Sequence, residues 1–165
     1  MKDLIIVRGG GDLATGTIYK LKKSGFPVLI LEAAQPSAIR RNVAFCEAVY
    51  QGTQTVENMT CYLAESLEQA QQFLNEGKLA VLVDPTGESI AVLNPLAVVD
   101  AILAKKNLGT NKRLAPITVA LGPGFRAGED VDAVIETKHG HNLGRVLWEG
   151  TAAPNTGIPG IIGGY

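Results

Sequence analysis

The sequence predicts an α/β fold: a Rossmann-like, mostly parallel sheet with flanking helices and a C-terminal β-hairpin. Apolar runs rich in β-branched residues recur along the chain, and segments with helical spacing separate them. The first run leads directly into a turn of three glycines and then into a helical pattern. Towards the C-terminus the alternation gives way to two short runs joined by residues 139–142, which is typical of a hairpin.

The first βαβ unit organises the rest of the chain. Residues 4–7 form an uninterrupted apolar run, as in a strand buried on both faces of a parallel sheet. A helix follows, with lysines in its last turn, and Gly25 ends it. Its apolar face is formed by Ala14, Ile18 and Leu21. Residues 26–31 form a second buried strand that ends on Glu32. This order of strand, glycine turn, helix, strand and acid indicates the start of a dinucleotide-binding fold.

The chemistry of a nucleotide site explains the spacing of this motif. Gly9 permits the tight turn, Gly11 lets the backbone approach a pyrophosphate, and Ala14 allows close helix–strand packing. Glu32 can accept hydrogen bonds from a ribose, which favours NAD over NADP. The residues expected to contact the nucleotide are Gly9, Gly10, Gly11, Asp12, Leu13, Ala14 and Glu32, together with Gly122 and Gly124 of a second glycine turn.

Asp12 argues against a phosphate site. We expect it at the helix N-cap, where its carboxylate would satisfy the free N–H groups and repel a phosphate. The motif is therefore also compatible with a capped helix that binds no ligand. Arg8 could offset the negative charge, but its side chain cannot be placed from the sequence.

The remaining elements follow from similar patterns. Residues 33–41 form a connection with two interpretations: a lid over the adenine side, with Arg40 or Arg41 near the phosphates, or a solvated basic turn, which is preferred for any single arginine. The further elements expected are a short helix and then a strand from residue 44, a helix over 66–77 capped by Ser66 and Gln69, a strand over 79–83, a helix over 94–106, a strand over 116–121, and hairpin strands over 131–137 and 143–148.

A few side chains outside the motif have candidate roles. Asp84 follows a buried strand at the ligand edge of the sheet, although an Asp-Pro turn explains it equally well. Cys46 lies in an apolar setting and is interpreted as a buried thiol. His139 and His141 lack further metal ligands and are interpreted as turn residues. With Glu136 and Asp84 they are the only candidate general bases, and no catalytic residue is assigned.

Bulk properties limit the classes of function. The length of 165 residues suits one domain, which we place at 1–150, followed by a glycine- and proline-rich segment over 151–165 that faces a ligand or leads into a truncated region. A formal net charge of −1 gives no electrostatic footprint for nucleic acid or an anionic membrane. Cys46 and Cys61 lack metal-site spacing, and the N-terminus lacks a signal-peptide core. We therefore expect a cytoplasmic protein with reduced thiols, with a homo-oligomer left open.

Five blocks carry a resemblance to a known family. They are Arg8 to Gly16, Ala38 to Arg41 with Ala44-Phe45, Gly122 to Phe125, Gly140-His141 with Leu143-Gly144, and Ala153 to Gly157. Together they resemble the YqeB family, the accessory proteins of selenium-dependent molybdenum hydroxylase systems. The resemblance implies a Rossmann-like fold, a role in maturation of those hydroxylases, and such a hydroxylase as partner, but no particular reaction. Members of that family extend beyond this length, so the chain corresponds to an N-terminal fragment or a short relative.

Two functions remain open at this point. The first is an accessory protein that binds NAD or a related small-molecule nucleotide. The second is a non-catalytic chaperone or docking module for a molybdenum hydroxylase, with structural glycine turns and no nucleotide. An S-adenosylmethionine-dependent methyltransferase ranks last, because Leu13 stands where that motif usually carries a further glycine.

Overall fold

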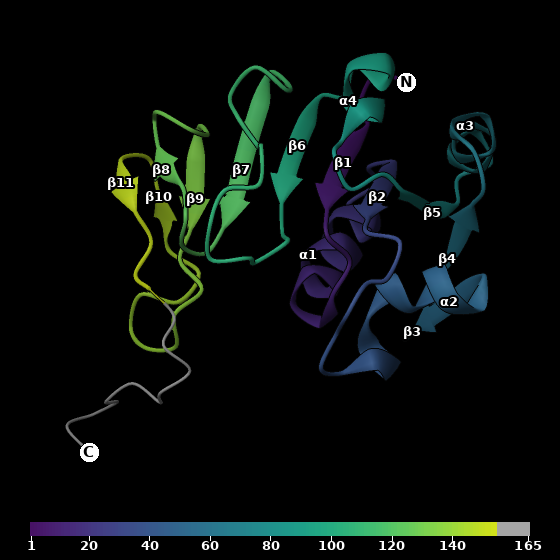
Figure 1. Ribbon diagram of the computed structural model, residues 1–165, viewed down its shortest axis with the longest axis horizontal. Coiled ribbons are helices and arrows are strands. Elements are labelled where there is room, and N and C mark those ends of the chain that lie inside the picture. The colour runs from purple at the N-terminus through teal and green to yellow at the C-terminus, as the bar shows by residue number, and fades with distance from the viewer. Residues whose placement is uncertain (155–165) are drawn as a thin grey trace.

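The computed structural model describes residues 1–154 and consists of a nine-stranded sheet with helices around one half of it (Figure 1). In spatial order the strands are β10 (Val146–Leu147), β9 (Ala133–Ile135), β7 (Ile117–Leu121), β6 (Ala97–Asp100), β1 (Ile5–Arg8), β2 (Val28–Glu32), β5 (Leu79–Val83), β4 (Met59–Ala64) and β3 (Thr53–Val56). A small second sheet pairs β8 (Arg126–Ala127) with β11 (Gly150–Thr151). The helices are α1 (Asp12–Lys23), α2 (Ala48–Gln51), α3 (Leu67–Asn75) and α4 (Glu88–Leu93), with 3₁₀ turns η1 (Arg41–Val43) and η2 (Phe45–Glu47).

The strand order is that of a doubly wound sheet. From β1 the chain proceeds to β2 and then β5 on one side, and afterwards to β6, β7 and β9 on the other side. All these strands are parallel, and within the nine-stranded sheet of residues 1–154 the antiparallel pairs are the edge pairs β3–β4 and β9–β10. The order reverses between β1 and β6, where Val7 lies between Ile30 and Val99. In such sheets ligands bind at the carboxyl ends of the strands at this switch point.

Two apolar layers hold the helices against the sheet. On one face, Ala14 and Ile18 of α1 pack in a cluster with Val7 and Ile30. On the other face, α3 and α4 contribute to a cluster with Ile6, Leu29 and Ala80 of the sheet. The helical members of that second cluster are Ala70, Leu74 and Ile90. Burial of each Val, Ile or Leu side chain contributes roughly 1.5–3 kcal/mol.

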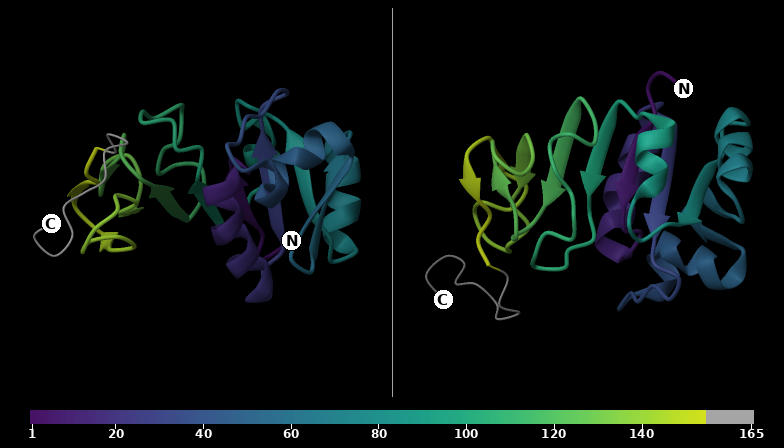
Figure 2. Two further views of the ribbon diagram at one scale, coloured as in Figure 1. Left: turned by 90° about the horizontal axis from the view of Figure 1, so that it is seen from below. Right: turned by 45° about the horizontal axis from the view of Figure 1, so that its top comes forward.

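The half of the sheet formed by β7, β9 and β10 has no helical cover among residues 1–154 (Figures 1 and 2). A third, smaller apolar cluster lies there instead, in which Phe125 and Ala127 of the β8 region pack against Ala120 and Val134. Both views of Figure 2 show the helices, in purple to teal, gathered at one end of the sheet, away from the green and yellow strands. This asymmetry leaves one face of the sheet open at β7, β9 and β10.

Most of the predicted elements are confirmed. The first βαβ unit is β1–α1–β2, the helix after Ser66 is α3, and the hairpin is β9–β10. Ser66 caps α3 as expected, because its side chain accepts a hydrogen bond from the N–H of Gln69 at 3.1 Å. The strands over 79–83 and 116–121 are β5 and β7, and the helix and strand after residue 44 are α2 and β3.

The helix predicted over residues 94–106 is wrong. This segment contains strand β6, and the helix lies earlier, as α4. Asn94 takes the left-handed conformation (φ 49°) and ends α4, after which the chain enters the sheet. Val98 and Val99 are then buried on opposite faces between β1 and β7. The apolar run fits a central strand as well as a helix, and tertiary burial decides between the two.

No helix among residues 1–154 combines the length and apolar character that crossing a bilayer requires. Of the predicted glycine- and proline-rich segment, only residues 151–154 are described, and the rest of it lies outside the described residues.

Candidate functional site

A cleft of about 360 Å³ lies at the switch point, where β1, β2 and β6 end. Its volume falls within the range of small-molecule sites. Six of the predicted nucleotide contacts line it: Gly9, Gly11, Asp12, Leu13, Ala14 and Glu32. The opposite walls are formed by the loop after β2 and the loop after β6, through residues 33, 35–39 and 101–103. We call this space the switch-point cleft.

Gly9 is required by the protein's own packing, and Gly10 is closely packed against its neighbours. Gly9 has a φ of 96°, and a Cβ on it would lie 2.8 Å from the carbonyl oxygen of Ala101. A Cβ on Gly10 would lie 3.1 Å from the Ile30 side chain and 3.3 Å from the Cys46 nitrogen. Gly10 therefore faces the core rather than the cleft. Its carbonyl accepts a 2.8 Å hydrogen bond from the Cys46 N–H.

Gly11 has no such structural reason to be glycine. Its backbone is extended (φ −66°, ψ −177°), a conformation open to any residue. A Cβ built on it meets no atom within 4 Å. The missing side chain leaves free space at the start of α1, inside the switch-point cleft. The position of Gly11 is therefore one where a ligand could approach the backbone closely.

The prediction that Asp12 caps α1 is wrong. The N-cap is Gly11, and no side chain caps the helix. Asp12 is instead the first helical residue, because the extended residue before the helix is Gly11, so that α1 starts one position earlier than expected. Its carboxylate pairs with Arg40 at 3.0 Å, which offsets the negative charge. Among residues 1–154, no acceptor binds the N–H groups of Gly11, Asp12, Leu13 or Ala14.

Glu32 ties the glycine turn to the end of β2. Its two carboxylate oxygens accept hydrogen bonds from the N–H groups of Gly10 and Ala33, both at 2.8 Å. A carboxylate offers about four lone-pair sites, so it can accept further hydrogen bonds from the cleft side. Glu32 is thus held in the place that a ribose-binding acid occupies in this fold class.

The loop over residues 33–41 forms one wall of the cleft. The Tyr50 hydroxyl anchors it by donating to the Pro36 carbonyl at 2.7 Å. Ile39 extends from the same wall with 94% of its surface exposed. Arg41, by contrast, forms two hydrogen bonds with Glu47, of 2.6 and 3.0 Å. The hydrogen bond from Arg41 lowers the pKa of Glu47. Of the two arginines, only Arg40 lies at the start of α1.

A buried polar network supports the third wall and was not anticipated from the sequence. Arg8 is 2% exposed, and its Nη1 donates to the Thr110 hydroxyl at 2.8 Å. That hydroxyl donates to Asp100 at 2.6 Å, and Asp100 also accepts from the Ile102 N–H at 3.1 Å. Arg8 does not line the cleft. Arg8 holds the loop after β6 against the ends of β1 and β6. The sequence signal for this network is limited to an arginine at the end of an apolar strand.

The second glycine turn lies at the same edge of the sheet but outside the switch-point cleft. A Cβ on Gly124 would lie 2.8 Å from the Cα of Lys106, and one on Gly122 would lie 2.9 Å from the Thr137 hydroxyl. Both glycines are therefore explained by packing. They lie at the end of β7 beside a second groove of about 440 Å³, which is enclosed by α1, β7 and β9.

Asp84 is held as a cap for α4. It accepts hydrogen bonds from the N–H groups of Gly87, Glu88 and Ser89 and from the Ser89 hydroxyl, at 2.6–3.1 Å. Burial raises the pKa of Asp84, but the hydrogen bonds from Ser89, Glu88 and Gly87 together outweigh it and lower that pKa. Asp84 does not line the switch-point cleft.

The surroundings of the other candidate residues, Cys46, His139, His141 and Glu136, do not favour metal binding or nucleophilic catalysis. Cys46 is 1% exposed, and burial, followed by the charges of Glu32 and Glu47, raises its pKa to about 11. His139 and His141 are exposed, and residues 1–154 contain no group of side chains that could hold a metal ion. Glu136 is buried and accepts from the N–H groups of Lys138 and Ala153, both at 2.9 Å.

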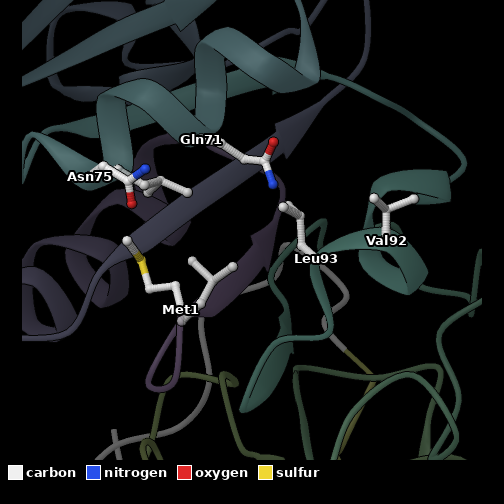
Figure 3. A pocket seen from close by; sticks show the side chains of 7 residues that line it. Met1, Gln71, Asn75, Val92 and Leu93 are labelled. Atoms are coloured by element: carbon white, nitrogen blue, oxygen red, sulfur yellow. The ribbon is translucent and has the colours of Figure 1, made fainter.

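A further pocket lies at the opposite edge of the sheet (Figure 3). Gln71 and Asn75 of α3 and Val92 and Leu93 of α4 line it with Met1. The two amides and the apolar walls include no acidic, basic or nucleophilic side chain. This pocket therefore offers no group for catalysis or for binding an ion.

These features define a Rossmann-like, doubly wound α/β protein with an open cleft at its switch point. Over 162 residues, 98% of this chain, it is 50% identical to the uncharacterized protein YqeB of Escherichia coli (strain K12). This match confirms the resemblance to the YqeB family. The chain spans 30% of the length of that relative. Comparison with protein-family models and with solved structures gave no match.

Proposed function

We propose that the switch-point cleft binds a nucleotide of the NAD type, and that the protein acts as an accessory factor in the maturation of selenium-dependent molybdenum hydroxylases. Gly11 is the observation that carries the first part. It is a glycine that neither backbone conformation nor packing requires, and it stands at an uncapped helix start inside a cleft. The second part rests on the resemblance to the YqeB family.

The binding mode follows from the groups that line the cleft. The pyrophosphate lies over Gly11 and accepts hydrogen bonds from the free N–H groups of α1, where the helix dipole also favours an anion. Arg40 offsets the charge of Asp12 beside it. Glu32 accepts from the ribose hydroxyls and disfavours a 2′-phosphate by repulsion. Ile39 covers the adenine from the loop wall.

A second candidate function is a docking module that binds no nucleotide. It is favoured by the exposed apolar residues around the C-terminal hairpin, where Leu143 is 56% exposed and Trp148 is 68% exposed. Such patches mark protein–protein interfaces more often than chance. In that case Gly9 and Gly10 would serve packing, and Gly11 would contact no ligand.

Isothermal titration calorimetry with NAD, NADH and NADP tests the first proposal. We expect wild-type protein to bind NAD and Gly11→Val to lose binding, because the new side chain fills the phosphate position. Gly16→Val is the matched control, since Gly16 lies on the same helix and its Cβ would also meet no atom within 4 Å. Absence of heat with all three nucleotides at millimolar concentration would exclude the nucleotide site.

Pull-down with a purified molybdenum hydroxylase as bait tests the second part. Capture that is lost in Trp148→Ser but kept in Gly11→Val would favour the docking module. Capture that depends on added NAD would favour the nucleotide-bound accessory factor. No capture in any state would refute a direct role with that enzyme.

A further inference from the structure

We infer that the ligand is a dinucleotide and that the ring of its second half binds in the groove enclosed by α1, β7 and β9. We call this space the second groove. The ring is planar and carries few polar groups, as nicotinamide does. The inference rests on the proposed function, because it takes the adenosine half and the pyrophosphate to lie in the switch-point cleft.

The first argument is continuity between the two spaces. Leu13 of α1 and Leu103 of the loop after β6 line both the switch-point cleft and the second groove. A ligand that leaves the helix start across these two residues therefore enters the second groove directly. The volumes of about 360 and 440 Å³ each fall within the range of small-molecule sites.

The second argument is the topology of the sheet. A doubly wound sheet consists of two mononucleotide-binding halves that meet at the switch point. Here β1, β2 and β5 form one half and β6, β7 and β9 form the other. The switch-point cleft lies over the ends of β1 and β2, and the second groove lies against β7 and β9. Each half of the sheet thus carries its own binding space.

The third argument is the chemistry of the second groove. Its walls are mainly aliphatic and are formed by Leu13, Leu103, Leu121, Pro123, Ile135 and Leu143. The hydroxyl groups of Thr17 and Thr137 supply hydrogen-bonding partners for a carboxamide. The Glu136 carboxylate already accepts from two N–H groups, while Lys105 and His139 are exposed. Such a surface suits a flat ring with one amide better than a second phosphate.

The fourth argument is the strained backbone at the border of the groove. Leu103 and Lys105 both take the left-handed backbone conformation, with φ of 59° and 65°. Residues other than glycine rarely adopt it; ligand sites are one place where it is retained, and turns or helix ends, as at Glu57 and Asn94 here, are another. The glycine at position 122 is needed because a Cβ there would lie 3.1 Å from Leu103 and 2.9 Å from Thr137. Both residues are thereby brought to the groove.

The experiment compares ADP-ribose with NADH, which differ by the dihydronicotinamide ring. Affinities are measured by titration calorimetry, and NADH fluorescence reports burial of the ring. We expect NADH to bind about tenfold more tightly than ADP-ribose, equivalent to about 1.4 kcal/mol. Leu143→Asp, which puts a charge on the exposed rim of the groove, is expected to remove this advantage and leave ADP-ribose affinity within about twofold. Val92→Asp is the control, because Val92 is also exposed (66%, against 56% for Leu143) but lies on α4 outside the groove.

The outcomes separate this inference from the proposed function. If ADP-ribose and NADH bind alike, or if Leu143→Asp leaves the advantage of NADH intact, the ring lies elsewhere and the inference is overturned while the nucleotide site stands. If neither ligand binds, both proposals fail together. An advantage of NADH that Leu143→Asp abolishes and Val92→Asp preserves supports the inference.

Discussion

Gly11→Ser should make the protein more stable and at the same time a weaker nucleotide binder. Gly11 is the N-cap of α1 and already has the extended backbone that a capping serine uses. Its Cβ would meet no atom within 4 Å, so the side chain enters without strain. The serine oxygen can then accept from the N–H of Leu13 or Ala14, which have no acceptor among residues 1–154.

The magnitudes follow from two separate effects. Serine in place of glycine at an N-cap gains a few tenths of a kcal/mol, and the less flexible unfolded chain adds about 0.4 kcal/mol or more. The sum of roughly 0.5–1 kcal/mol raises Tm by about 1–4 °C in a domain of this size. A bound phosphate would lose one charge-assisted hydrogen bond of about 1.5–3 kcal/mol, which weakens binding roughly 10- to 100-fold.

Thermal unfolding by circular dichroism and calorimetric titration with NAD measure the two effects on the same samples. Gly16→Ser is the control, because it makes the same change on the exposed side of α1, and it should stabilise slightly without altering affinity. A Gly11→Ser protein with raised Tm and unchanged NAD affinity would refute the phosphate position. A lowered Tm would refute the capping geometry itself.

Four other predictions concern residues around the site. Glu32→Gln should raise the affinity for NADP relative to NAD, because repulsion of the 2′-phosphate is removed while the amide oxygen keeps the Gly10 contact; a ratio unchanged in titration would contradict this. Asp84→Asn should destabilise the protein near neutral pH and leave nucleotide binding unchanged. Because the folded pKa of Asp84 is lowered, its contribution is complete above the unfolded pKa of about 3.9 and disappears as pH falls through the lower folded value, so urea unfolding of wild type and variant should converge at acid pH. Arg8→Met should lower the free energy of unfolding, measured in urea, by about 3 kcal/mol or more. The substitution removes the buried positive charge that is linked to the buried Asp100 carboxylate through the Thr110 hydroxyl, and a loss below about 1 kcal/mol would argue against the network. The thiol of Cys46, with its pKa raised to about 11 by burial, should not react with a disulfide reagent at pH 8 until the protein is unfolded.

The sequence predicts the elements whose signals are local. Buried strands such as β1, β2 and β5 appear as continuous apolar runs. Helix α3 is predicted by the capping residue Ser66 and by the helical spacing of its own apolar residues. Residues 97–100 show where local signals fail. Their burial on two faces depends on β7, which follows later in the chain, and above all on β1, which lies at the start of the chain far from β6.

The site divides in a similar way. Six cleft residues could be named from the glycine motif, because its spacing is set by a local turn and a helix start. The N-cap could not be assigned correctly, since Gly11 and Asp12 are adjacent and only the backbone angles decide which of them begins α1. The walls over 35–39 and 101–103 are irregular loops, whose approach to the turn depends on distant anchors such as Tyr50 and Arg8.

The central position of β1 has a consequence for how the chain folds during synthesis. The ribosome releases β1 first, and β2 arrives about twenty residues later to cover one of its edges. Its other edge stays unpaired until β6 has been made, and the hydrogen bond from Arg8 to Thr110 cannot form until roughly a hundred residues have emerged. At about 5–20 residues per second the nascent chain exposes an unpaired apolar strand for several seconds or more. Such long-range pairing is intrinsically slow, and an unpaired strand edge is open to aggregation until its partner strand arrives.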